Sequence, residues 1–140
     1  MVRTAKPVPL TGLFAALADP TRLRLLNLMA GREVCVCYFV EILRQGQPKI
    51  SRHLAYLRKA GIVTARREGK WIHYRISPPA DAAAASILNA TLASLRGEKQ
   101  MQSDLTKLDR ACCTPQRLIV PEGAPRPSLL LARTSLRPEF

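Results

Sequence analysis

Residues 47–76 decide the fold of this chain, and they read QPKISRHLAYLRKAGIVTARREGKWIHYRI. Pro48 suits the first turn of a helix, where its missing N–H has no partner to lose. Ile50, Leu54 and Leu57 then recur at the spacing of one buried helix face. The pattern predicts a helix that runs from Gln47 to residue 60, before a glycine.

Two strands are expected directly after this helix. Residues 62–67 and 71–76 are rich in β-branched and aromatic side chains and flank Glu68-Gly69-Lys70, which is typical of a tight β-hairpin. In the second strand we expect Ile72, Tyr74 and Ile76 to point inward. His73 is interpreted as a residue of the opposite strand face rather than as a ligand.

Upstream, three further helices are expected. Residues 10–18 form the first, with an apolar face, and Asp19-Pro20 starts the second by an N-cap and a proline at the first helical position. Arg22 and Arg24 in the second helix are candidates for contacts with solvent or phosphate. The third is expected at 36–45, ended by Gly46. The order predicts a mainly α fold with a small β-hairpin (α+β), a winged helix-turn-helix.

After the hairpin, residues 80–110 are expected to form one long helix of Ala, Leu and Ser, weakened or kinked at Gly97. Its apolar surface exceeds what a small core covers, which predicts a homodimer through N- and C-terminal helices. We divide the chain into an N-terminal arm (1–9), a DNA-binding and dimerisation domain (10–110) and a Pro-rich, flexible tail (111–140).

The distribution of charge along the chain indicates what kind of molecule it binds. The 140 residues contain 22 Lys and Arg against 10 Asp and Glu, a formal net charge of +12. Residues 1–78 hold 14 basic and 4 acidic residues, so most of the excess lies beside the helix and hairpin. A concentrated basic segment predicts binding to double-stranded DNA. We expect a cytoplasmic protein without a membrane span, and the absence of a Gly-rich phosphate loop or paired carboxylates argues against an enzyme.

The candidate DNA contacts come from two elements. The second helix of such a motif lies in the major groove, and a basic hairpin tip reaches flanking phosphates or the minor groove. The candidates are Gln47, Lys49, Ser51, Arg52, His53, Tyr56, Arg66, Arg67 and Lys70.

These residues carry a resemblance to a known family. LADPTRLR at 17–24, QP at 47–48, SRHL at 51–54, LRKAGIV at 57–63 and REGKWIHYRI at 67–76 resemble the ArsR/SmtB winged-helix transcriptional repressors. The resemblance covers about half of the chain and implies a homodimeric repressor bound to operator DNA. It also implies that Gln47, Ser51 and His53 stand where the family meets DNA.

The four cysteines occur as Cys35-Val36-Cys37 and Cys112-Cys113. Two such pairs in a cytosolic chain favour a thiolate site over simple packing. Residues two apart on an ideal helix do not share a face, so Cys35 and Cys37 would bind one ion only if the start of the helix were distorted. We therefore expect ion binding to strain the segment that supports the DNA-reading helix.

The segment at 33–37, EVCVC, resembles the site of the arsenite-responsive branch of the family, which implies As(III) or Sb(III) as effector. The third cysteine of that branch would fall at Val40, so Cys112 or Cys113 is a candidate third ligand, from the same or the partner subunit. The zinc-binding branch is excluded, since no His follows His73.

Other interpretations stay open. A thiol-redox switch through Cys112 and Cys113 is one. A sensor of Cd or Pb, or of methylated trivalent arsenic, which needs two thiols, is another. A DNA-binding protein without a small effector is the third.

Overall fold

The computed structural model describes residues 10–113, 125 and 127–129 of the chain. The helices in this part are α1 (Leu10–Leu17), α2 (Pro20–Met29), α3 (Val36–Leu43), α4 (Gln47–Lys59), α5 (Ala82–Leu95) and α6 (Lys99–Cys113). The strands are β1 (Arg32–Cys35), β2 (Val63–Glu68), β3 (Trp71–Ile76) and β4 (Ser128–Leu129). The expected arm at 1–9 and most of the expected tail at 111–140 lie outside the described residues.

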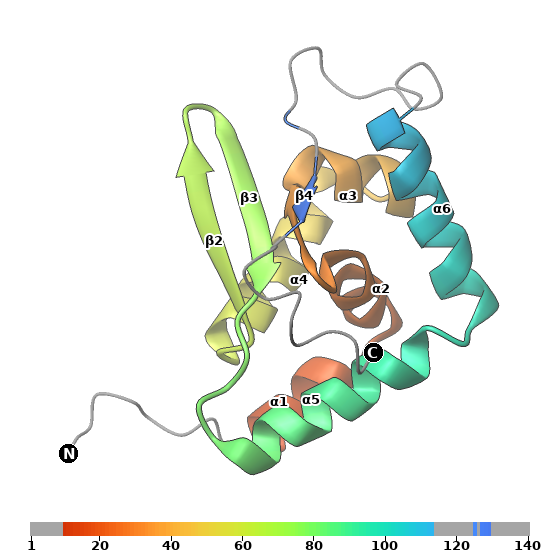
Figure 1. The fold of residues 1–140 in the computed structure, drawn as a ribbon. Helices are drawn as coiled ribbons and strands as arrows, with labels where there is room; N and C mark the ends of the chain where they lie inside the picture. The colour runs from red at the N-terminus through yellow and green to blue at the C-terminus, as the bar shows by residue number, and fades with distance from the viewer. Residues whose placement is uncertain (1–9, 114–124, 126, 130–140) are drawn as a thin grey trace.

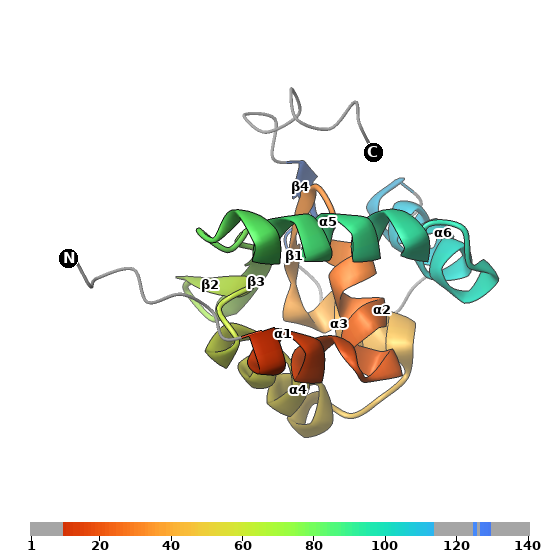
Figure 2. The same ribbon diagram turned by 90° about the horizontal axis from the view of Figure 1, so that it is seen from below.

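Helix α2 lies at the centre of the molecule and packs against each of the other helices (Figures 1 and 2). It starts as the sequence predicts, because the Asp19 carboxylate accepts a hydrogen bond from the Arg22 backbone N–H at 3.0 Å and Pro20 follows at the first helical position. Its apolar side chains Leu25, Leu26 and Met29 are fully buried. The helix therefore forms the middle of the core on which the other elements are placed.

The sheet has the strand order β2-β3-β1-β4, and each neighbouring pair is antiparallel. The hairpin β2–β3 confirms the predicted wing: Glu68 pairs with Trp71 around a two-residue loop in which Gly69 has a φ of +60°. Strands β1 and β4 were not expected from the sequence. They extend the hairpin into a larger sheet, with β1 next to β3 and β4 on the outer edge of β1.

The register assigns the side chains to two faces of this sheet, because successive residues of a strand alternate. Val34, Tyr74 and Ala65 share one row and face the core, where the Tyr74 ring lies 6.4 Å from that of Phe39. The next row, of Cys35, His73 and Arg66, belongs to the opposite face.

The third helix is shorter than expected. Helix α3 ends at Leu43, where Arg44 adopts a left-handed conformation with a φ of 58°. Gly46, which we expected to end this helix, is instead the N-cap of α4. The turn between α3 and α4 thus contains only residues 44–46, the short connection typical of a helix-turn-helix.

The expected long helix at 80–110 is two helices. Helix α5 ends at Leu95, and α6 begins at Lys99 after a turn that contains Gly97. Figure 1 shows α5 along one end of the molecule and α6 rising beside α2 and α3. Folding back lets Met101, Leu108 and Ala111 of α6 enter the core, which a straight helix would leave exposed.

Within the described residues, no helix combines the length and the hydropathy that crossing a membrane requires.

Candidate DNA interface and thiol site

Helix α4, called the reading helix below, turns one polar face away from the core. Ile50, Leu54 and Leu57 are fully buried, as the sequence predicts, and they fix the orientation of the helix. Gln47, Lys49, Arg52 and Tyr56 are exposed and Ser51 is half-buried, so these candidate contacts stand on the open side of the helix. Gln47, Lys49, Ser51 and Arg52 are therefore available to a ligand, whereas Tyr56 is exposed but carries the Arg22 guanidinium over its ring, 4.1 Å from the ring centroid.

His53 differs from the other candidates on this helix. Its Nδ1 atom lies 3.3 Å from Nη1 of Arg22 and 3.9 Å from a carboxylate oxygen of Asp19, both at the start of α2. Partial burial lowers the pKa of His53 below its ordinary value of 6.5. The ring faces α2 rather than the open surface, so its first role is in packing the reading helix.

The wing, residues 63–76, carries three candidate cations with different surroundings. Arg67 and Lys70 are exposed near the tip, where Arg67 Nη1 donates to the Gly69 carbonyl at 3.4 Å and Lys70 lies over the Trp71 ring at 5.1 Å. Arg66 instead forms a forked ion pair with Glu33 of β1, at 3.1 and 2.7 Å. The Arg66 guanidinium, by these hydrogen bonds, lowers the pKa of Glu33.

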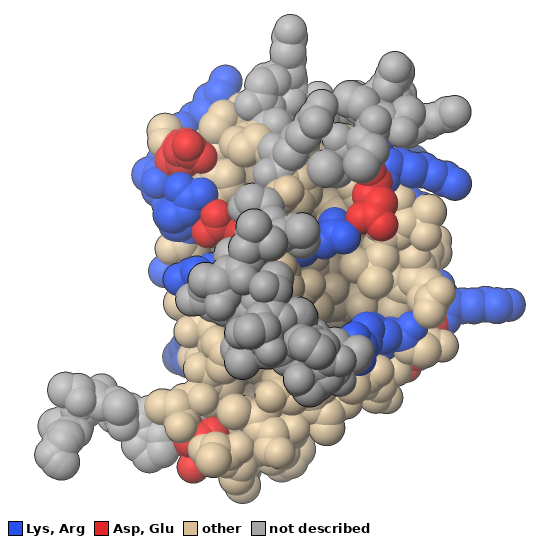
Figure 3. Space-filling model, viewed as in Figure 1, with Lys and Arg blue, Asp and Glu red and all other residues tan. Residues whose placement is uncertain are grey.

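On the molecular surface, basic side chains gather along the edge formed by the wing, with acidic side chains among them (Figure 3). Glu33 had no place in the sequence-based site, because its partner lies 33 positions away and two strands across the sheet. Of the wing candidates, Arg67 and Lys70 have no ion pair within the described residues, whereas the charge of Arg66 is compensated.

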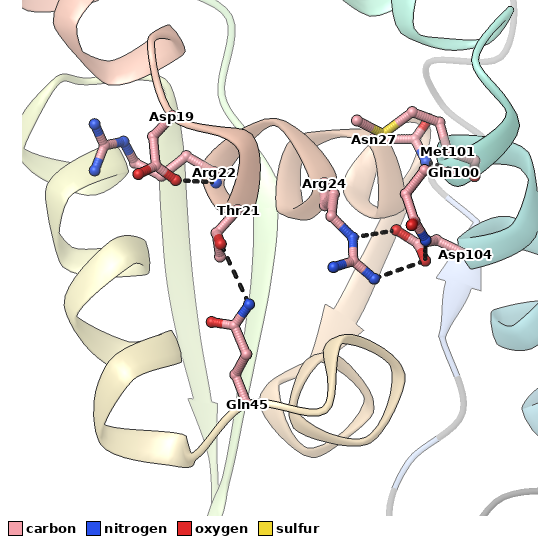
Figure 4. A network of polar contacts seen from close by, with 9 residues as sticks. All are labelled: Asp19, Thr21, Arg22, Arg24, Asn27, Gln45, Gln100, Met101 and Asp104. Carbon is pink, nitrogen blue, oxygen red and sulfur yellow. Dashed lines mark hydrogen bonds and ion pairs between the residues drawn. The ribbon is translucent and has the colours of Figure 1, made fainter.

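Helix α2 positions the reading helix through the polar residues of the stretch 19–24 (Figure 4). Thr21 accepts a hydrogen bond at 3.3 Å from Gln45, in the turn before α4. Arg24 forms a forked ion pair with Asp104 of α6, at 2.8 and 3.0 Å. Arg22 and Arg24, expected to face solvent or phosphate, are thus both engaged inside the molecule, and that expectation was wrong.

Cys35 and Cys37, the thiol pair, lie at the junction of β1 and α3. Cys35 is the last residue of β1 and the N-cap of α3, with extended backbone angles of −73° and 144°, while Cys37 lies in the first helical turn. Their Sγ atoms are 3.6 Å apart. The expected distortion of a helix start is therefore not needed, because Cys35 is not helical in the first place.

The thiol pair shares one proton. The Cys37 thiol donates to Cys35 Sγ, and this hydrogen bond, helped by backbone N–H groups and by the charge of His73, lowers the pKa of Cys35 to about 6. The same hydrogen bond and burial raise the pKa of Cys37. One thiolate is thus available at neutral pH, in a site where Cys35 is fully buried and Cys37 half-buried.

His73 lies opposite Cys35 in the sheet register, and its Nε2 atom is 2.8 Å from Glu68 at the end of β2. His73 lies on the strand face opposite that of Tyr74, as expected, but it is buried, at 4% exposed, whereas Ile72 and Ile76, expected to point inward, are half-buried. Among the described residues, no three His, Cys, Asp or Glu side chains are grouped closely enough to hold a metal ion. Cys112 and Cys113 end α6, and their side chains lie outside the described part.

Comparison with known proteins agrees with this architecture. Residues 19–65 match the family described as "Bacterial regulatory protein, arsR family". An "Arsenical resistance operon repressor" of Escherichia coli is 51% identical over 78 residues, which are 55% of this chain and 67% of that protein. The chain belongs to the arsR family.

Further relatives agree with this assignment. The "Arsenic resistance transcriptional regulator ArsR2" of Pseudomonas putida is 43% identical over 81 residues, covering 57% of this chain and 70% of that protein. Among solved structures, HlyU of Vibrio cholerae superposes with a TM-score of 0.54 at 27% identity, over 64% of this chain and 92% of that one. BigR of Xylella fastidiosa, a transcriptional repressor, gives 0.50 at 34% identity, over 61% and 84%.

Membership of the arsR family confirms the winged helix-turn-helix fold and the class of function. The chain is a DNA-binding transcriptional regulator and not an enzyme. The match at 19–65 contains α2, the thiol pair, the reading helix and the start of β2.

Proposed function

We propose that this chain is a dimeric repressor that holds operator DNA and releases it when Cys35 and Cys37 bind trivalent arsenic or antimony. The observation that carries the proposal is the 3.6 Å separation of the two sulfurs at the junction of β1 and α3. The E. coli and P. putida relatives are named for arsenical and arsenic resistance, which supports the same effector class.

The geometry of the thiol pair fits one thiophilic ion. Two sulfurs about 2.3 Å from a shared ion lie roughly 3.8 Å apart at a tetrahedral angle. The smaller angles of a pyramidal trivalent ion bring them closer, toward the 3.6 Å of this structure. Soft thiolates select such ions over hard cations, and Cys35 already favours the thiolate form. When arsenous acid binds, two As–O bonds break as the two As–S bonds form: one hydroxide leaves as water with the Cys37 proton, and the other takes a proton from solvent, because Cys35 is already a thiolate.

The position of the thiol pair connects it to both DNA-contacting elements. Strand β1 pairs with β3 of the wing, and α3 leads through residues 44–46 into the reading helix. Because the sulfurs already stand at the separation that one ion needs, release requires that this arrangement of the junction be less favourable when the wing and the reading helix are placed on DNA. This arrangement supports release through altered placement of the wing and the reading helix, without the strained helix start that the sequence suggested.

The groups that would contact DNA are the exposed polar and basic side chains of the reading helix and of the wing tip. Gln47, Ser51 and Arg52 have the side chains for base edges, while Lys49, Arg67 and Lys70 suit phosphates. His53 and Arg66 contribute indirectly, since their polar atoms face Arg22 and Glu33.

Helices α1 and α5 would form the interface between the two chains of the dimer. Leu10 and Phe14, which belong to the expected apolar face of the first helix, are 48% and 52% exposed, and they form an apolar surface on α1. Helix α5 exposes mainly small residues, which allow close approach of a second helix. A two-fold dimer would place two reading helices in successive major grooves, about 34 Å apart.

A two-thiol site favours one particular alternative effector, methylated trivalent arsenic, because this species has two valences for sulfur. Inorganic arsenite has three, and Cys112 or Cys113 is our candidate for the third ligand, since α6 packs against α3 and ends at this pair. Whether that ligand comes from the same or the partner subunit is part of the test.

The deciding experiment measures release from a duplex that the wild-type chain selects from a random DNA pool. Cys35→Ser with Cys37→Ser should keep DNA affinity and lose release by arsenite. Cys112→Ser with Cys113→Ser is the matched control, which should retain release by methylated trivalent arsenic. If the first double variant still responds to arsenite, the thiol pair is not the sensor. Release by peroxide, but not by arsenite, Cd or Pb, would favour the redox switch.

A further inference from the structure

The Arg22 side chain contacts three different helices. Its Nε and Nη2 atoms donate to the carbonyls of Ala16 and Ala15, both at 2.9 Å, in the last turn of α1. Its Nη1 atom faces His53 of the reading helix at 3.3 Å. Figure 4 shows the guanidinium reaching from the start of α2 toward the reading helix.

The flat face of the same guanidinium is also occupied. Arg22 lies over the Tyr56 ring, with 4.1 Å between the guanidinium carbon and the ring centroid. Tyr56 lies three residues, about one turn, after His53, so stacking and the contact with His53 hold the reading helix at two successive turns. The edge of the Arg22 guanidinium thus contacts α1, and its flat face contacts the reading helix.

These contacts require arginine rather than any cation. Carbonyls at the end of a helix lack the usual partner four residues later; the Ala15 carbonyl accepts from the Ala18 N–H at 3.2 Å, and the planar fork of Arg22 adds a donor to it and to the Ala16 carbonyl while still stacking on a ring. Lysine would keep the charge but could not make both donor contacts and the stacked contact at once. Asp19 fixes the start of α2 by accepting the Arg22 backbone N–H, so the root of the side chain is held as well.

We propose that Arg22 is a positioning residue that couples the placement of α1 to the orientation of the reading helix. Helix α1 carries the exposed Leu10 and Phe14, so a second chain that docks there acts on the carbonyls that Arg22 holds. The proposal rests on the proposed function in one respect, the use of the reading helix for DNA. It assigns no direct contact between Arg22 and DNA.

The test separates positioning from phosphate contact by salt dependence. Arg22→Lys and Arg22→Gln should each weaken binding to the selected duplex by about tenfold, within the range for residues that transmit coupling. The slope of log affinity against log salt should stay at the wild-type value in both. In the matched control Arg52→Gln, which removes an exposed cation of the same helix, the slope should fall by about 0.9.

Hydrogen exchange of the free chain gives a readout that needs no DNA. Amides of α1 should exchange faster in Arg22→Lys than in the wild type, and Tyr56→Leu should have the same effect in smaller measure. If an Arg22 variant fails to fold, exchange in Tyr56→Leu still measures whether the stacked contact links α1 to the reading helix. In a double-mutant cycle, the losses of DNA affinity from Arg22→Lys and Tyr56→Leu should be less than additive.

Three outcomes would overturn the coupling. The first is that Arg22→Lys binds the selected duplex with wild-type affinity. The second is that the salt-dependence slope falls by about one in Arg22→Gln, and the third is that hydrogen exchange in α1 is the same in Arg22→Lys as in the wild type. A wild-type chain that binds no duplex contradicts the proposed function instead, and exchange in α1 still decides whether Arg22 links the helices.

Discussion

The Arg24 guanidinium forks onto both carboxylate oxygens of Asp104, 80 positions later in the chain, at 2.8 and 3.0 Å. Asp104 is fully buried and also accepts from Gln100 at 3.0 Å. One turn further along α2, the Asn27 amide donates to the Met101 carbonyl at 3.0 Å. These contacts fasten α6 to α2 and explain why the C-terminal helical region folds back on the core.

Asp104→Asn should destabilise the chain by about 3 kcal/mol, because it leaves Arg24 with its charge uncompensated in a mostly buried place. Urea unfolding followed by circular dichroism measures this change. The ion pair of Arg32 with Asp109 is the control, since Asp109 is 60% exposed. Asp109→Asn should change the free energy of unfolding by less than about 0.5 kcal/mol, and equal losses in both variants would contradict the role of burial.

Val40→Cys should add a third sulfur to the thiol pair. Positions 37 and 40 lie one turn apart on α3 and share a helix face, and Val40 is half-buried beside the junction. We expect arsenite to release DNA from Val40→Cys at a concentration at least about tenfold lower than from the wild type. A tenfold change corresponds to a gain in binding free energy of roughly 1.4 kcal/mol from the added sulfur ligand. Arsenic X-ray absorption should give three sulfur neighbours in this variant even when Cys112 and Cys113 are both serine.

Glu33→Gln should release the charge of Arg66 for DNA. In the wild type this charge is compensated by the forked ion pair, so the variant should steepen the salt dependence of DNA binding by about 0.9 in the logarithmic slope. Arg67→Gln, which removes a wing cation without an ion pair, should reduce the slope by about the same amount. A reduction of that size in Arg66→Gln would show that the ion pair opens when DNA binds.

His53 should make the chain less stable in mild acid. Burial lowers the pKa of His53 in the folded chain, so the unfolded chain binds more protons as pH falls below 6.5, and folding stability decreases. His53→Gln removes this contribution. Urea midpoints measured at about pH 7.5 and about pH 5.5 should therefore fall less in His53→Gln than in the wild type. An equal fall in both would locate the acid sensitivity elsewhere.

Local signals predict most of the helices and the wing. Asp19-Pro20 starts α2, the spacing of Ile50, Leu54 and Leu57 sets the buried face of the reading helix, and Gly69 turns the hairpin as expected. Each of these features depends on neighbours within a few positions, which is why periodicity and capping residues reveal them.

Features that depend on distant partners escape such signals. Strand β1 has four residues and exists because Val34 and Cys35 pair with Tyr74 and His73. Without β1, the sequence gives no sign of the extended backbone at Cys35 that brings the two sulfurs together. Glu33 and Asp104 are likewise explained by arginines far away in the chain, and nothing in their own neighbourhood indicates an ion pair.

The pairing of Ser128 and Leu129 with β1 has a consequence for shortened forms of the chain. Glu33 and Arg32 use the outer side of β1 to pair with these two residues, so β4 occupies the sheet edge next to the thiol pair. A chain that stops before Ser128 would leave that edge with unpaired backbone groups, a template for strand addition by another molecule. Truncation is therefore expected to favour edge-to-edge aggregation, even though all the buried core residues of the described part lie before residue 112.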